Sequence, residues 1–186
     1  MTVAAVVLAA GASRRLGRPK QMVEIGGETL LERAVRVAAE AGLKPVIVVV
    51  REERVADGLR DCEVVVNEFA DEGVAASIRC GVARATDLGV AGVVVLACDQ
   101  VMLRAEHLRD LYSVSNQITG SGYAGKVGIP AYFPEEEFAG LMVLRGDVGA
   151  RELLRGAAAV VDEELALDVD TEADLERARD WADGGS

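Results

Sequence analysis

The stretch "VVLAAGASRRLGRPK" (Val6–Lys20) joins the two features that decide the fold, an apolar run and a loop of small residues. The run begins at Val3, and its Val-rich composition is typical of a strand buried on both faces. The loop then crowds cations into seven positions, namely Arg14, Arg15, Arg18 and Lys20. A buried strand that ends in such a loop favours a parallel α/β sheet, in which ligands bind at the carboxyl ends of the strands.

Val-rich runs alternate with helical patterns through the first half of the chain. The predicted strands are Val3–Leu8, Lys44–Val50, Cys62–Asn67 and Ala91–Ala97. One predicted helix has a capping box at Thr29 and Glu32 and ends near Gly42, and a second covers Gly73–Thr86. This order predicts an α/β fold: a Rossmann-like, doubly wound, mainly parallel sheet with helices on both faces, in a single domain.

The second half is less regular. Residues 118–133 predict a strand, a glycine-rich turn and another strand, whereas 135–144 and 148–156 have helical spacing. Residues 165–181 predict a strand followed by a helix that Thr171 and Asp174 cap. Because no linker or repeat interrupts the chain, we expect one domain over residues 1–181 and a frayed tail at 182–186.

The composition narrows the class of protein. A hydrophobic fraction of 51% supports a folded core, and 31 acidic against 20 basic residues, a net charge of −11, argue against a nucleic-acid partner. No apolar segment is long enough for a transmembrane helix, and the cations follow the first apolar run instead of preceding it as in a signal peptide. Cys62, Cys80 and Cys98 are too far apart for a zinc motif. We therefore expect a cytoplasmic protein with free thiols and no membrane partner.

The loop after the first strand suits a phosphate ligand. Its small residues let backbone N–H groups turn towards an anion, while Arg15 and Lys20 can neutralise a di- or triphosphate. Neither the Walker pattern nor G-x-G-x-x-G fits the loop. A solvated loop whose cations only aid solubility remains an alternative.

Two aspartates follow predicted strands and could hold a cation. Asp99 ends an apolar run, where a lone carboxylate is costly unless a cation or hydrogen bonds satisfy it, and Asp170 ends a later strand. Mg²⁺ needs only one or two carboxylates beside phosphate oxygens and water. A helix cap is the alternative role for both aspartates. The histidine, His107, is expected on the surface of a helix, and no Ser-His-Asp or Cys-His arrangement is evident.

The segment "LAAGASRRLGRPK" resembles the signature L-A-[AG]-G-x-S-x-R-[ML]-G-x-x-K of the MobA-like nucleotidyltransferases. Five further segments follow in the order seen in the MocA branch, the molybdenum cofactor cytidylyltransferases: "NEFADEGVAASIRCG", "ACDQ", "GIPAYF", "GDVGAR" and "DVDTEADL". Together they span Leu8 to Leu175. The resemblance implies transfer of a nucleoside monophosphate from a nucleoside triphosphate to a phosphorylated pterin-type acceptor, with Mg²⁺ and release of pyrophosphate, and a molybdoenzyme as a possible recipient of the product.

The resemblance also assigns roles to single residues. Arg15, Lys20 and Asp99 take catalytic roles, with Asp99 and Asp170 at the metal. The nucleotide-binding set is Leu8, Ala9, Ala10, Gly11, Arg15, Lys20, Asn67 and Ser77. Segments Gly128–Pro130 and Gly146–Arg151 are the expected neighbours of the acceptor.

The residue at position 10 bears on which nucleotide the protein uses. The cytidylyl branch tends to have alanine where guanylyltransferases have glycine, so Ala10 favours CTP over GTP. Val101 replaces the proline usual after the metal motif, and Leu16 stands where methionine is common. A guanylyltransferase, a nicotinamide-dependent oxidoreductase on the same scaffold and a non-catalytic cofactor carrier remain alternatives.

Overall fold

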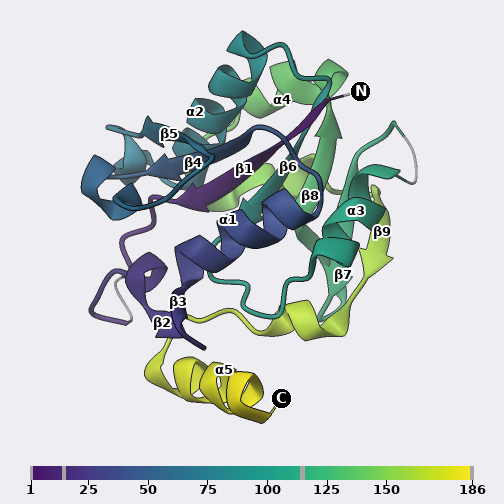
Figure 1. The fold of residues 1–186 in the computed structure, drawn as a ribbon. Helices are drawn as coiled ribbons and strands as arrows, with labels where there is room; N and C mark the ends of the chain where they lie inside the picture. Colours follow the sequence, from purple (N-terminus) through teal and green to yellow (C-terminus); the bar gives the residue numbers. More distant parts are fainter. Residues whose placement is uncertain (1, 14–15, 114–115, 185–186) are drawn as a thin grey trace.

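A seven-stranded sheet forms the centre of the molecule in the computed structural model, which describes residues 2–13, 16–113 and 116–184 (Figure 1). The strand order is β5-β4-β1-β6-β8-β7-β9. Pairing is parallel except for β8, which runs antiparallel to both neighbours. The strands are β1 (Val3–Ala9), β4 (Val46–Val50), β5 (Glu63–Val66), β6 (Gly92–Ala97), β7 (Thr119–Tyr123), β8 (Lys126–Pro134) and β9 (Ala158–Val161).

Helices cover both faces of this sheet, which confirms the predicted fold class. The longer helices are α1 (Leu30–Glu40), α2 (Val74–Asp87), α3 (Ala105–Ser113) and α5 (Glu172–Gly184), and α4 (Phe138–Met142) is a short one. Apolar residues of α1 and α3 pack on one face, and those of α2 and α4 pack on the other. None of the helices in the described part of the chain is long and apolar enough to cross a membrane.

Short sequence patterns account for the helices and strands in the first half of the chain. The Thr29 side chain accepts a hydrogen bond from the Glu32 backbone N–H at 3.1 Å, and the Glu32 carboxylate accepts from the Thr29 N–H at 2.7 Å, so the capping box is confirmed. Val6 is fully buried in the middle of β1, between parallel neighbours β4 and β6. The strand predicted from Lys44 begins two residues later, at Val46.

The second half departs from the predictions at three places. The helix expected over 148–156 is largely a 3-10 segment (Gly146–Glu152), because Gly149 has a positive φ of 59° that interrupts helical geometry. The strand expected after residue 164 is a 3-10 turn (Glu163–Ala166) followed by an isolated bridge between Gln100 and Asp168. The edge strand β9 was not predicted.

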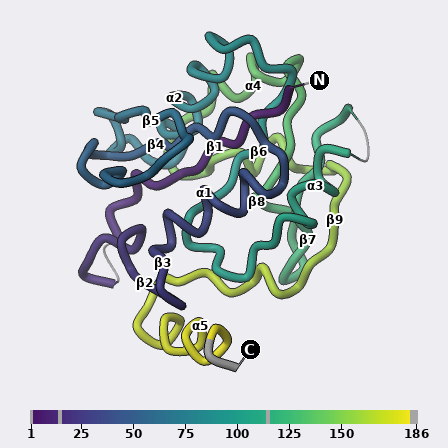
Figure 2. The backbone as a smooth tube through the Cα atoms, viewed as in Figure 1, coloured from purple at the N-terminus to yellow at the C-terminus, as the bar shows by residue number. Residues whose placement is uncertain are grey.

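A short hairpin, β2 (Glu24–Ile25) with β3 (Glu28–Thr29), was also missed. Figure 2 shows the C-terminal helix α5, in yellow, beside this hairpin at one end of the molecule. Leu175 and Ala178 of α5 are fully buried in a separate apolar cluster that includes Leu16 and Ile25. The hairpin and α5 therefore support the loop that follows β1.

Candidate active site

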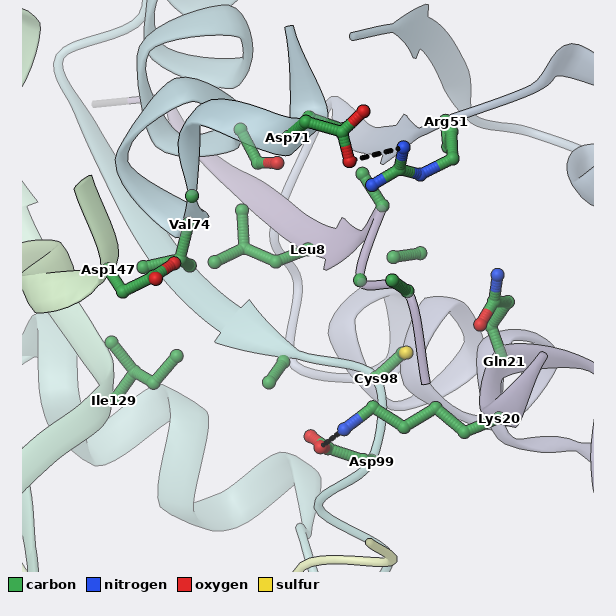
Figure 3. Close-up of a pocket in the computed structure, with 18 residues that line it drawn as sticks. Leu8, Lys20, Gln21, Arg51, Asp71, Val74, Cys98, Asp99, Ile129 and Asp147 are labelled. Carbon is green, nitrogen blue, oxygen red and sulfur yellow. Dashed lines mark hydrogen bonds and ion pairs between the residues drawn. The ribbon is translucent and has the colours of Figure 1, made fainter. Parts of the chain in front are cut away.

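The loop after β1 meets the ends of the neighbouring strands at one edge of the sheet. Because β4 and β6 flank β1 in parallel, their carboxyl ends lie at the same edge as Ala10 and Gly11. A cavity of about 460 Å³ opens there (Figure 3). The chain crosses from β1 to β4 on one side and reaches β6 on the other, so this is the topological switch point at which open α/β sheets bind ligands.

Lys20 and Asp99 line the charged end of the cavity, and Asp170, which does not line it, contacts Lys20 there. The Lys20 ammonium donates to Asp99 Oδ2 and, at 3.1 Å, to Asp170 Oδ1 (Figure 3 shows the first contact). The side chains of Lys20 and Asp99 are 19% and 12% exposed. Burial by itself lowers the pKa of Lys20, but the charges and hydrogen bonds of Asp99 and Asp170 outweigh it and raise the pKa above 10.5. Lys20 therefore stays cationic in the ligand-free site.

The loop backbone positions Lys20. Its N–H donates to the Ser13 hydroxyl at 2.9 Å, which fixes the start of the 3-10 turn Lys20–Met22. Arg18 is held separately by Glu172 at 2.7 Å, an exposed ion pair that ties the loop to α5. Arg15, for which the family resemblance implies a catalytic role, lies outside the described residues.

Asp168 is a third carboxylate near this end, and it was not predicted from the sequence. Burial raises the pKa of Asp168 to about 7, with further contributions from the charges of Asp99 and Asp170. Within the described chain, its buried Oδ1 has no hydrogen-bond partner. A buried acceptor atom of this kind, beside the carboxylates of Asp99 and Asp170, marks a site that can take more positive charge.

A divalent ion fits this donor set only together with a phosphate ligand. Over residues 2–13, 16–113 and 116–184, no group of three His, Cys, Asp or Glu side chains is placed to hold a metal by itself. Mg²⁺ does not need such a cage, because one or two carboxylates suffice when phosphate oxygens complete its shell. Asp99 and Asp170 meet that requirement, because both carboxylates contact the Lys20 ammonium and therefore lie close together.

The end of the cavity at which the nucleoside is expected is apolar and formed by the backbone after β1. Leu8, Ala9, Ala10 and Gly11 all line the cavity. A side-chain atom added to Gly11 would meet nothing within 4 Å, so this glycine leaves open space directly on the cavity wall. Small residues here permit close approach of a ligand to the backbone.

Ser77 lines the cavity, whereas Asn67 lies behind it. The Asn67 amide donates to the Ser77 hydroxyl at 3.0 Å, and its oxygen accepts from the Phe69 N–H at 2.9 Å. Asn67 is only 1% exposed. In the described structure, Asn67 can therefore orient Ser77, but it does not itself form the wall.

Arg51 lies at the end of the cavity away from Lys20, and it was not identified from the sequence. It directly follows β4 and pairs with Asp71 at 2.9 Å (Figure 3). Its Nε is buried and has no hydrogen-bond partner among the described residues. The signal that pointed to Asp99, a charged residue directly after a buried strand, applies equally to Arg51.

The second half of the chain supplies the remaining wall. Ile129 and Asp147 line the cavity, so each of the segments expected near the acceptor contributes one residue. Gly73 makes this possible, because a side chain there would lie 2.5 Å from the Asp147 carboxylate. Arg151, at the end of the second segment, is exposed and does not line the cavity.

His107 was expected on the surface, and this prediction was wrong. The side chain is buried between α3 and the sheet, where its Nε2 lies 2.7 Å from the Ser121 hydroxyl. His107 precedes the buried Leu111 by one helical turn, which places both on the face of α3 that packs inwards. The cysteines Cys62, Cys80 and Cys98 are free, as expected.

The chain is similar to known proteins over most of its length. The chain is 31% identical to the purine catabolism protein PucB of Bacillus subtilis in an alignment 193 positions long, which covers 94% of each protein. It is 39% identical to a probable molybdenum cofactor guanylyltransferase of Opitutus terrae over 109 residues, which cover 59% of this chain and 54% of that protein.

Among solved structures, Rv0371c of Mycobacterium tuberculosis superposes with a TM-score of 0.85 at 32% identity, covering 97% of this chain and 98% of that one. A second structure of Rv0371c, in complex with manganese, gives a TM-score of 0.79 at 30% identity and covers 97% and 99% of the two chains. The family model of the MobA-like NTP transferase domain matches residues 5–164, which contain the loop after β1, Lys20 and Asp99. The chain belongs to the MobA-like NTP transferase family.

Proposed function

We propose that the protein transfers CMP from CTP to the phosphate of a molybdopterin-type acceptor and releases pyrophosphate. The observation that carries this proposal is the position of Lys20 between Asp99 and Asp170, at the end of a cavity floored by the backbone of Ala9 to Gly11. A cation and two carboxylates beside an open backbone platform suit a metal-bound triphosphate.

The protein's own groups account for most of the proposed reaction. The backbone after β1 receives the nucleotide, and Lys20 neutralises phosphate oxygens once it exchanges its carboxylate partners for them. Asp99 and Asp170 would hold Mg²⁺, which supplies positive charge to the triphosphate and orients it. The manganese complex of Rv0371c supports a divalent ion in this family.

The proposed transfer of CMP needs no general base. An oxygen of the acceptor phosphate attacks the α-phosphorus of CTP, the bond from that phosphorus to the bridging oxygen breaks, and pyrophosphate leaves with the electron pair. The acceptor oxygen is already anionic, so no proton has to be removed. His107 does not line the cavity, and its Nε2 is engaged by Ser121, which is consistent with a mechanism based on positioning and charge.

The choice of CTP rests on Ala10, which is 3% exposed on the cavity wall. Its methyl group narrows the space where a purine would lie. A guanylyltransferase is the second candidate, favoured by the name of the Opitutus terrae relative. The name of PucB places that relative in purine catabolism and indicates no nucleotide.

The test compares the nucleotides with one acceptor. Purified protein, Mg²⁺ and molybdopterin are incubated with CTP or GTP, and pyrophosphate release is measured. We expect turnover with CTP, and near-complete loss in Asp99→Asn, which removes charge but keeps the side-chain shape. Asp87→Asn, an exposed position at the end of α2, is the matched control and should leave turnover unchanged.

Preference for GTP in this assay would assign the guanylyl activity instead. Absence of pyrophosphate with both nucleotides would refute the proposed transfer to molybdopterin. Oxidation of NAD(P)H by a quinone-like dye would then favour the oxidoreductase alternative.

A further inference from the structure

The pairing of strand β8 with β7 is interrupted next to the candidate active site. Gly120 of β7 pairs with Ala131, but the following residue, Ser121, pairs with Gly128. Ile129 and Pro130 therefore stand opposite no residue of β7. The pairing of β8 with β6 on its other side also stops at Ala131. The two residues form a bulge, a feature that commonly re-aims side chains beside active sites.

Side chains replace the missing ladder bonds of this bulge. The Ile129 carbonyl accepts from the Gln100 amide at 2.9 Å and from the Tyr123 hydroxyl at 2.9 Å. The Pro130 carbonyl accepts from the Ser121 hydroxyl at 2.6 Å. Two side chains of β7 and one from the loop after β6 thus hold two consecutive carbonyl groups, and the Ile129 carbonyl has two partners where burial requires one.

His107 completes this network from α3. The single hydroxyl proton of Ser121 is used on the Pro130 carbonyl, which can only accept, so the His107 Nε2–H must donate to Ser121 Oγ at 2.7 Å. Burial lowers the pKa of His107, and the charge of Asp162, with Oδ2 at 3.8 Å from Nδ1, offsets this only in part. The neutral ring with its proton on Nε2 is therefore the form that this network uses.

The network is buried, but its end point is on the cavity wall. Ser121 is fully buried and His107 is 5% exposed, so neither can touch a substrate. Ile129, in contrast, lines the nucleotide cavity across from Gln21 (Figure 3). Gln100, which also holds the bulge, directly follows Asp99.

We propose that Ser121, His107 and Tyr123 are positioning residues that set the Ile129–Pro130 bulge as the wall against which the acceptor is held. The identity of the acceptor rests on the proposed function, whereas the effect of these three residues on the position of Ile129 does not. The close approach of Tyr123 supports the assignment, because a side chain at Gly128 would lie 2.8 Å from the Tyr123 hydroxyl oxygen.

The kinetic test separates positioning from general stability. Ser121→Ala removes the hydroxyl that holds Pro130, and Thr119→Val is its control: Thr119 is 1% exposed on the same strand, but its hydroxyl bonds Gln117 at 3.2 Å. In Ser121→Ala we expect the KM for molybdopterin to rise on the order of tenfold, because small misplacements of a binding group are costly. The Kd for CTP should stay within about twofold.

A second pair repeats the comparison with milder changes. Tyr123→Phe removes one bond to Ile129, whereas Tyr132→Phe removes a hydroxyl that bonds Asn116 at 3.1 Å, away from the bulge. The KM for molybdopterin should rise in Tyr123→Phe and not in Tyr132→Phe. Equal effects within both pairs would overturn the proposal.

A third measurement needs no acceptor. Methyl-labelled isoleucine gives resonances for Ile25, Ile47, Ile78, Ile118 and Ile129, and Ile129→Val assigns the last one. Ser121→Ala and Tyr123→Phe should shift the Ile129 methyl, whereas the two control variants should not. If wild-type protein does not turn over molybdopterin, the proposed function fails, and this measurement alone then tests whether the network positions Ile129. An unmoved Ile129 resonance in Ser121→Ala would refute the inference.

Discussion

Replacing Lys20 tests whether its two ion pairs stabilise the ligand-free site. Lys20→Met keeps the aliphatic stem but leaves Asp99 and Asp170 facing each other without their shared cation. Removing one partner of a fully buried pair costs about 3–5 kcal/mol, whereas exposed pairs are worth about 0–1 kcal/mol. At 19% and 12% exposure for Lys20 and Asp99, an intermediate loss of about 2 kcal/mol is expected. For a chain of this size, that lowers the Tm by roughly 4–8 °C.

Thermal unfolding at pH 8, with and without Mg²⁺, is the assay. In Lys20→Met, the carboxylates of Asp99 and Asp170 should bind Mg²⁺ better than they do in the wild type, where the Lys20 ammonium contacts both of them. With a Kd of about 1 mM, Mg²⁺ at about 10 mM would return about 1.4 kcal/mol. Lys44→Met, at an exposed position, is the control and should show neither effect. A Tm for Lys20→Met equal to that of the wild type would show that these pairs contribute nothing to stability. A lowered Tm that Mg²⁺ does not raise would refute metal binding by the two carboxylates.

Three further substitutions probe the cavity. Gly11→Ala should leave the Tm unchanged, since the new methyl meets no atom within 4 Å, but should weaken CTP binding in titration calorimetry because it occupies ligand space. Asp168→Asn should stabilise the ligand-free protein at pH 8 and not at pH 4: a folded-state pKa of about 7 against 3.8 makes the folded form bind more protons, so stability falls as pH rises between these values, by at most about 4 kcal/mol. Equal unfolding curves at pH 8 would contradict this. Ala10→Gly should reduce the preference for CTP over GTP, measured as the ratio of kcat/KM values, by roughly tenfold or more, and an unchanged ratio would remove Ala10 as the selecting residue.

Features with a local signal were predictable from the sequence. The capping box at Thr29 needs only the residue types three positions apart, and it is present as expected. Asp99 was found because a carboxylate directly after a buried strand is costly without a partner, and the structure supplies Lys20 as that partner. Since parallel strands all present their carboxyl ends at one edge, topology alone brings the loop after β1 close to Asp99.

Features that depend on contacts between distant segments were not predictable in this way. Asp168 was read as part of a strand, and its burial follows from the isolated bridge to Gln100, which no spacing in the sequence indicates. The Ile129–Pro130 bulge was not predicted either: Gly128 and Pro130 are residue types that can mark a bulge, but the pairing that defines it involves β7. His107 is different, because its one-turn spacing from Leu111 already placed it on the apolar face of α3.

The positive charge on the loop after β1 has a structural explanation in an acidic protein. Asp99, Asp168 and Asp170 come from two distant segments and gather at one end of the cavity, where the charges of Asp99 and Asp170 help to raise the pKa of Asp168. Without a cation, this arrangement would destabilise the fold and repel a triphosphate. The Lys20 ammonium offsets the repulsion between these carboxylates by pairing with Asp99. To attract a triphosphate as well, Lys20 has to leave Asp99 when a metal ion arrives with the nucleotide. In the proposed reaction, stability of the fold and affinity for a metal-bound nucleotide therefore depend on the same ammonium group.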